Sequence, residues 1–383
     1  MKDSVISALE SMFTIQRWNF LPRIETWVEA ENAAYVTHVA YAIGRATGLT
    51  QEQLECLVLR ALLKSLNKHY MTDISLDVRD RLKEKNSKAW TDLINGTAKR
   101  TASIFPRKIS RDITIFLTSS PSYEDKYAQI KDHDKNIIEN LVKCSQLLVA
   151  RQECEINSTI YRADYEPIIR SISSRMDRIE MAGEYKIVWS EHTPYFTTIK
   201  NLKYLRRWNR INRIVSSNVL GHTFLVSFLA IILSMLAIDE IKNGDHFIYK
   251  VVLRSLFHDV PESLTGDIIT PVKSEIEKYA PKILEDVEKE LQDKFVKSAP
   301  SGVKMDIEHY ELLKEIDNKS IFSFTSMTKD CDRLAAVLEC HYEKASGIST
   351  HEIDSAYENY LQELAKSEWT SVKDFIRIVK DTK

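Results

Sequence analysis

The chain has 383 residues, of which 28% are charged and 44% are hydrophobic, and its formal net charge is −2. This composition is that of one large or two ordinary globular domains, and it excludes a disordered chain or a strongly basic nucleic-acid-binding protein. Only nine Gly and nine Pro favour long helices over tight hairpins. The five Cys form no CxxC pair, so we expect reduced thiols and a cytoplasmic location.

Apolar residues recur at three-to-four-residue spacing along most of the chain and predict an all-α fold. In the first part, this spacing predicts helices over residues 33–46, 52–66 and 136–150. A short apolar run at 112–120 is compatible with a strand. The least helical stretch is 183–198, which we interpret as a linker.

The segment 219–238 is mostly apolar and is long enough to cross a membrane. His222, Ser227 and Ser234 interrupt it, so we expect a buried core helix and no membrane partner. Further along, residues 332–345 again have helical spacing.

The same short motifs occur twice in the chain, in the same order. Arg17-Trp18-Asn19 recurs 190 residues later as Arg207-Trp208-Asn209. Two further blocks repeat with similar spacing: VLRALLKSL (58–66) with VLRSLFHDV (252–260), and NLVKCSQLLVARQEC (140–154) with SMTKDCDRLAAVLEC (326–340). Three matched blocks indicate a tandem duplication with copies at residues 1–190 and 191–383, hereafter the first and second halves.

Four residues of the second half form a set of nitrogen and oxygen ligands suited to a divalent metal ion: His222, His258, Asp259 and Asp332. His258 and Asp259 are adjacent on a segment expected to be helical, so they can flank one ion. Asp330 competes with Asp332 for the last position, and the alignment of the third repeated block favours Asp332.

The order His222, His258-Asp259, Asp332 resembles the signature of HD-domain metal-dependent phosphohydrolases. Arg207-Trp208, the run HDVPESLTGDIITPVK (258–273) and KDCD (329–332) narrow the resemblance to the bacterial 5′-deoxynucleotidase subgroup. The resemblance covers about residues 200 to 345. It implies an all-α bundle that uses a divalent metal to release phosphate from deoxynucleoside monophosphates.

Beside this resemblance, the residue types suggest roles for five further side chains. Glu262 could position or deprotonate the attacking water, and a continuous helix would place it on one face with His258 and Asp259. Asp267 could meet the leaving oxygen or a sugar hydroxyl. Arg207 offers a fork for phosphate, Trp208 a flat wall for a sugar or base, and Lys273 either a phosphate contact or a helix cap.

Two residues depart from the pattern of the subgroup. Gly221 replaces the Glu that usually precedes the first His, which removes a carboxylate and loosens the start of the helix. Pro261 has no backbone N–H, so a helix must start, end or kink there. Neither departure removes a metal ligand.

In the first half, every expected ligand is replaced. Asn32, Lys64, Ser65 and Ser145 stand opposite the four ligands, and Lys68 stands opposite Glu262. A Lys repels a cation, so we expect no metal here. Members of the subgroup pair as homodimers, which suggests that this degenerate half is a built-in partner in a pseudo-dimer. A second HD dipeptide, at residues 133–134, lies in a charged stretch and is interpreted as surface.

Three functions remain open at this stage. The first is removal of phosphate from a (deoxy)nucleoside monophosphate, and the second is hydrolysis of a nucleoside triphosphate or a cyclic or signalling nucleotide. The third is a non-catalytic nucleotide sensor, against which the complete ligand set argues. One divalent ion is expected, and Mn, Co, Fe, Zn and Mg all suit the ligand set.

Overall fold

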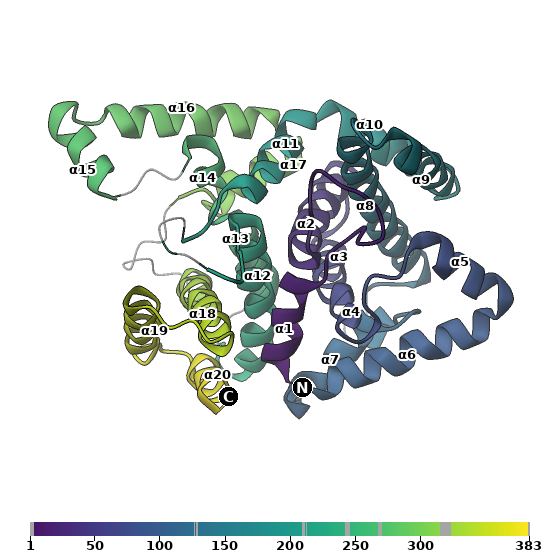
Figure 1. Ribbon diagram of the computed structural model, residues 1–383, viewed down its shortest axis with the longest axis horizontal. Coiled ribbons are helices and arrows are strands. Elements are labelled where there is room, and N and C mark those ends of the chain that lie inside the picture. Colours follow the sequence, from purple (N-terminus) through teal and green to yellow (C-terminus); the bar gives the residue numbers. More distant parts are fainter. Residues whose placement is uncertain are drawn as a thin grey trace.

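In the computed structural model, the regular elements are all helices across the residues that it describes: 4–125, 127, 129–208, 211, 213–241, 246–266, 270–314 and 323–381. The expected all-α fold is therefore confirmed. The helices of the first half lie on one side of the molecule and most of those of the second half on the other, with α11 between them (Figure 1).

The first half contains eleven α-helices and two short 3₁₀ turns among the described residues. Their bounds are α1 Val5–Thr14, α2 Glu29–Ala46, α3 Gln51–Leu63, η1 Lys64–Asn67, α4 Lys68–Met71, α5 Leu76–Lys85, α6 Ser87–Ser103, α7 Arg107–Leu117, η2 Tyr123–Asp125, α8 Asp132–Ser158, α9 Arg162–Met176, α10 Ala182–Glu191 and α11 Thr193–Asn201, the last extending past residue 190.

The second half continues with a further series of helices in its described ranges. Their bounds are η3 Leu202–Tyr204, α12 Val219–Leu236, η4 Ile238–Glu240, α13 Phe247–Phe257, α14 Val260–Thr265, α15 Thr270–Tyr279, α16 Ile283–Ser298, α17 Ser301–His309, α18 Ser323–Ala345, α19 His351–Leu364 and α20 Thr370–Asp381.

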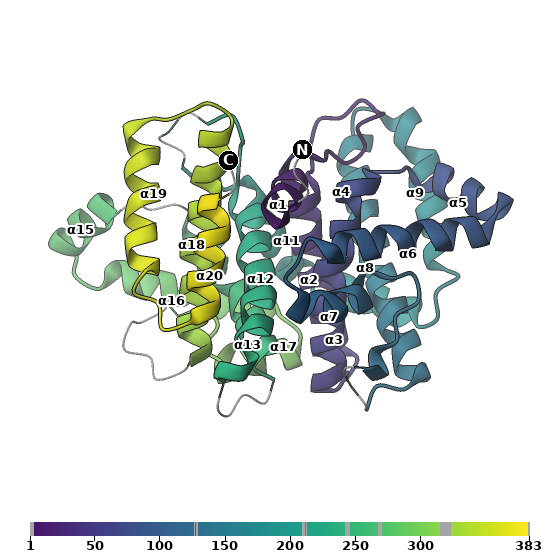
Figure 2. The ribbon, with the colours of Figure 1, turned by 90° about the horizontal axis from the view of Figure 1, so that it is seen from below.

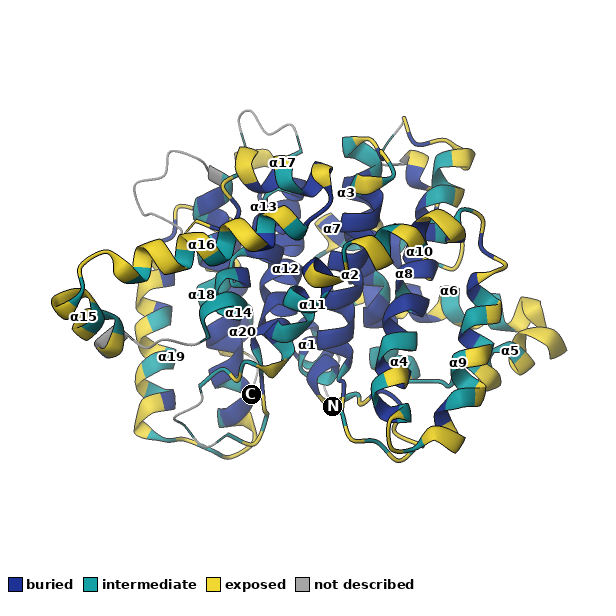
Figure 3. Ribbon diagram, turned by 90° about the horizontal axis from the view of Figure 1, so that it is seen from above, coloured by how far each residue is buried: buried dark blue, intermediate teal, exposed yellow. Residues whose placement is uncertain are grey.

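Helices α2 and α12 pack against each other at the centre of the molecule (Figures 2 and 3). Each has 18 residues, and α12 begins and ends 190 residues after α2. The contacts around them are reciprocal, because α17 packs on α2 while α7 packs on α12. Equivalent elements meeting themselves across an interface is the pattern that a two-fold dimer produces.

The junction between the halves is buried and mostly apolar, with one charged cluster. The rings of His38 and Tyr41 on α2 lie edge-on against Phe257 of α13. Nearby, Asp306 of α17 accepts a hydrogen bond from the Tyr41 hydroxyl and forms an ion pair of 2.8 Å with Arg45. Burial of apolar surface at this junction stabilises the association of the two halves.

Helix α12 is the expected core helix. It has the length and hydropathy of a membrane span, but 94% of the apolar stretch is buried inside the molecule. His222, Ser227 and Ser234 are fully buried in it. The five Cys are also buried and form no disulfide.

Two sequence expectations about local structure are wrong. The apolar run at 112–120 belongs largely to α7, because Ile109, Ile113 and Phe116 recur at helical spacing and are buried. The expected linker at 183–198 forms α10 and α11, on which Tyr185, Tyr195 and other aromatic side chains are buried. Tertiary packing outweighs the weak local preference in both places.

Candidate metal centre

The strand-like segment before α12 positions Arg207 and Trp208. Arg206 forms an isolated antiparallel bridge with Asn218, which closes the loop between them. Trp208 has φ of 56°, a left-handed conformation that is uncommon for a bulky residue. Its indole N–H donates to Glu339 at 2.9 Å, and the Arg207 Nε–H donates to the same carboxylate at 3.2 Å.

His222 lies in the first turns of α12, whose start is set by Asn218. The Asn218 side chain accepts a hydrogen bond of 2.9 Å from the N–H of Gly221, as an N-cap should. A Cβ atom at Gly221 would lie 3.0 Å from the ring of Phe13 on α1. The glycine therefore admits a helix of the first half at this point, as well as lacking the carboxylate.

His258 and Asp259 lie at a break between two helices, so the expectation of one continuous helical segment through Glu262 is wrong. Helix α13 ends at Phe257, and α14 begins at Val260 with Pro261 in its first turn. Pro tolerates this position because the first N–H groups of a helix need no intrahelical acceptor. The expectation that Pro261 marks a helix boundary is confirmed.

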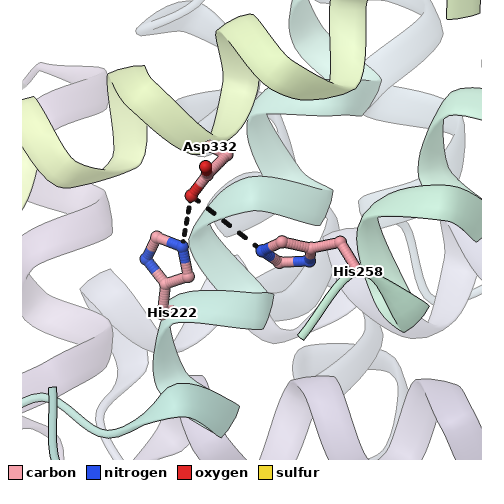
Figure 4. A group of neighbouring side chains, drawn as sticks. All are labelled: His222, His258 and Asp332. Carbon is pink, nitrogen blue, oxygen red and sulfur yellow. Dashed lines mark hydrogen bonds and ion pairs between the residues drawn. The ribbon is translucent and has the colours of Figure 1, made fainter. Parts of the chain in front are cut away.

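Asp332 comes from α18 and meets both histidines (Figure 4). Its Oδ1 is 2.9 Å from Nε2 of His222 and 4.0 Å from Nε2 of His258. Oδ2 of Asp259 lies 3.2 Å from Nε2 of His258 and 3.9 Å from Nε2 of His222. Asp330 points elsewhere, accepting from the Ser367 hydroxyl.

The chemistry of this cluster fits a bound metal ion. One ligand atom from each of His222, His258 and Asp332 lies within 4.8 Å of the other two. Nε2 of His258 and Oδ2 of Asp259 are buried and have no hydrogen-bond partner among the described residues. Buried polar atoms are normally satisfied, so an ion held between them would supply the missing partner.

Glu339 was not predicted, although it organises the site. Its buried carboxylate binds Arg207 and Trp208, and its Oε1 lies 3.6 Å from Nδ1 of His222. A carboxylate behind a ligating imidazole fixes the orientation of the ring. The available signal was the Glu-Cys pair that ends the third repeated block in both halves.

The carboxylates favour positive charge at the centre of the site. Burial and Arg207 lower the pKa of His222, but Glu339 and Asp332 outweigh them and raise it to about 9. Burial also opposes ionisation of Asp259, yet His258, His222 and Arg207 hold its pKa well below the usual range. The pocket thus stabilises a cation between ionised carboxylates.

Glu262 lies on α14, where burial and the neighbouring Asp259 raise its pKa to about 7. Lys273 lies on α15 and forms an ion pair of 3.5 Å with Glu288 of α16. Asn209 and Asp267 lie outside the described residues.

The first half has the same framework around different side chains. Glu153 accepts from Nε of Arg17 at 2.9 Å and from the indole of Trp18, whose φ is 55°. Nδ2 of Asn32 donates to the same carboxylate at 2.8 Å, in the place where His222 faces Glu339. The pattern of contacts is retained without the imidazole.

The ligand positions of the first half are occupied by basic and polar groups. Nζ of Lys68 pairs with Glu29 at 2.6 Å and with Asp73 at 3.0 Å. The expectation that Ser145 stands opposite Asp332 is wrong by one position. Because Glu153 and Glu339 make equivalent contacts, the helices align 186 residues apart, which pairs Asp332 with Gln146 and leaves Ser145 fully buried.

Comparison with known proteins places this site. The profile of a family described as YfbR-like 5′-deoxynucleotidase matches residues 194–382. Residues 194–382 belong to this family. The match spans the whole metal cluster and the Arg207-Trp208 segment.

Individual relatives agree with this family assignment. The 5′-deoxynucleotidases of Yersinia pestis (strain Pestoides F) and Yersinia pseudotuberculosis serotype O:3 (strain YPIII) are each 28% identical to the chain over 161 residues, which is 40% of this chain and 75% of theirs. A solved HD-domain phosphohydrolase from Listeria innocua is similar at 20% identity with a TM-score of 0.39, covering 48% of this chain and 85% of its own.

Proposed function

We propose that the 5′-deoxynucleotidase-like second half is a metal-dependent phosphohydrolase that removes phosphate from a (deoxy)nucleoside monophosphate. The observation that carries this proposal is the convergence of His222, His258 and Asp332 on one point, inside the segment that matches the family. Asp259, beside both imidazoles, is the fourth proposed ligand.

The bound divalent ion would act as a Lewis acid toward the phosphate and lower the pKa of a bound water. Glu262 suits the positioning and deprotonation of that water, since a carboxyl group with a pKa near 7 can accept and release a proton at neutral pH. Arg207 keeps its Nη1 3.6 Å from Asp259, so its guanidinium faces the proposed site of the phosphate. We propose Trp208 and Asp267 as sugar or base contacts and Lys273 as an outer contact.

We also propose that the two halves are tandem copies packed as a pseudo-dimer, with the first half at residues 1–190 lacking the metal. The equal lengths of α2 and α12, the reciprocal packing of α7 and α17, and the matched Arg-Trp-Glu contacts support this proposal. A cytoplasmic location fits the five free thiols.

The test is phosphate release from a panel of nucleoside mono-, di- and triphosphates and cyclic nucleotides, each with Mn²⁺, Co²⁺ or Mg²⁺. We expect metal-dependent release from deoxynucleoside monophosphates and loss of at least 100-fold in kcat/KM for Asp259→Ala. His133→Ala, in the exposed HD dipeptide of α8, is the matched control and should retain full activity. Turnover that no metal supports, or an Asp259→Ala variant as active as the parent, contradicts the assignment.

A further inference from the structure

A cavity of about 550 Å³ lies in the first half, among α5, α6, α8 and the end of α9. This volume is within the range of about 300–1,000 Å³ that is typical of small-molecule sites. Its lining includes Asn32, Lys64, Ser65 and Lys68, the residues that stand opposite the metal centre. The position of the lost active site is therefore still a cavity, which we call the cationic cavity.

The lining of the cationic cavity contains nine basic and four acidic side chains. The acidic ones are engaged close by: Glu29 and Asp73 with Lys68, Glu139 with Arg60, and Asp80 with Arg175. Five positive charges remain in excess. Lys143 and Arg178 form no ion pair with any carboxylate of the described residues.

The basic groups stand at two depths. Lys64 and Arg79 are partly buried, with side chains 33% and 35% exposed, and Nε of Arg79 has no hydrogen-bond partner among the described residues. Lys83, Lys143 and Arg178 are exposed along the rim. Burial and the neighbouring Arg60 lower the pKa of Lys64 to about 8, and burial together with Arg175 lowers the pKa of Arg79. An anion among these groups would relieve their mutual repulsion.

One wall of the cavity is apolar and includes a flat aromatic ring. Trp90 and Ile94 of α6 face the cavity together with Met71 and Leu147. Nζ of Lys83 lies 5.8 Å from the Trp90 ring centroid. A ring that stacks on Trp90 would therefore leave its phosphate within reach of the basic groups.

We propose that the cationic cavity binds a nucleoside phosphate without a metal ion, with Lys64, Arg79 and Arg175 around the phosphate and Trp90 against the base. Lys64 and Lys68 replace the metal as the source of positive charge at this position. Arg provides a planar fork that matches phosphate oxygens, and Lys a point charge. This site is distinct from the metal centre, and it does not depend on turnover there.

The test is isothermal titration of the full-length chain in EDTA, with dAMP in one arm and inorganic phosphate in the other. Arg175→Gln should raise the Kd for dAMP about tenfold, because it removes a charge-assisted hydrogen bond. Arg170→Gln is the matched control, since Arg170 lies on the same helix, pairs with Glu166 and does not line the cavity. It should leave the Kd unchanged.

A second variant separates the base from the phosphate. Trp90→Leu should raise the Kd for dAMP severalfold and leave the Kd for inorganic phosphate unchanged, with thermal denaturation confirming that the variant is folded. Any of three results overturns the proposal: no dAMP binding at millimolar concentration, dAMP binding no tighter than phosphate, or dAMP binding that Arg207→Ala abolishes and Arg175→Gln does not change. Phosphate release by the second half is measured separately, so failure of the proposed catalysis leaves these outcomes intact.

Discussion

Replacing Glu339 by Gln tests whether this buried carboxylate orients His222 for metal binding. The substitution keeps the size of the side chain and one acceptor oxygen, but it removes the negative charge 3.6 Å from Nδ1 of His222. We expect Mn²⁺ or Co²⁺ to bind 10- to 100-fold more weakly, which is the effect of removing a group that supports a ligating imidazole.

The same substitution should also lower the stability of the chain. Arg207 and Trp208 both donate to Glu339, and the Arg207 side chain is only 19% exposed. Breaking a buried ion pair costs about 3–5 kcal/mol, and we expect about 3 kcal/mol because the amide oxygen still accepts a hydrogen bond. Urea denaturation followed by circular dichroism measures this loss, and isothermal titration with the metal measures the change in affinity.

Glu153→Gln in the first half is the matched control. Glu153 makes the equivalent contacts with Arg17 and Trp18 but faces Asn32 where Glu339 faces a histidine. It should reduce stability by a similar amount and leave metal affinity unchanged. If Glu339→Gln binds metal as tightly as the parent, or if the two variants weaken metal binding equally, Glu339 has no specific role in orienting His222.

Three further outcomes follow from packing, charge and the junction between the halves. Gly221→Leu should destabilise the chain by about 1–3 kcal/mol in urea denaturation, because even a Cβ there lies 3.0 Å from Phe13. Although burial alone would raise it, Lys64 and Arg60 lower the pKa of Glu139 to about 2, so this carboxylate contributes about 3 kcal/mol above pH 4.5 that is lost as the pH falls toward 2; Glu139→Gln should thus be much less stable than the parent at pH 7 and nearly equal to it at pH 2.5. The isolated fragment 191–383 should aggregate or fold poorly, because it exposes the face of α12 that α2 covers.

Each of these predictions has its own control and contrary result. Gly96→Leu on α6, where nothing lies within 4 Å of an added Cβ, should cost little, and an equal loss at both glycines would remove the packing argument. A Glu139→Gln deficit that is as large at pH 2.5 as at pH 7 would show that the carboxylate does not contribute through its charge. A monomeric fragment 191–383 that is fully folded and releases phosphate would rule out dependence on the first half.

The helices and the metal cluster were largely predictable, because both depend on local patterns. The spacing of apolar residues is enough to recognise α12 as buried, and Pro261 is enough to place a helix boundary beside His258-Asp259. The strand expected at 112–120 and the linker expected at 183–198 were wrong because tertiary burial of Phe116, Tyr185 and Tyr195 decides those segments.

The rest of the site could not be read from ligand spacing. Glu339 acts through Arg207, Trp208 and His222, which are more than 100 residues away in the sequence, so no local motif includes it. The register of Ser145 was wrong by one residue for a related reason. Sequence identity in that block is low, and only the shared contacts of Glu153 and Glu339 fix the alignment.

The packing of α2 on α12 has a consequence for evolution and for dilution. In a pair of separate identical chains, a mutation alters both sites at once, and lowering the protein concentration separates the partners. Here the two helices belong to one covalent chain, so each side of their contact can change alone, and their effective concentration stays constant however dilute the protein is. The loss of imidazoles and the gain of lysines in one half then need not alter the other.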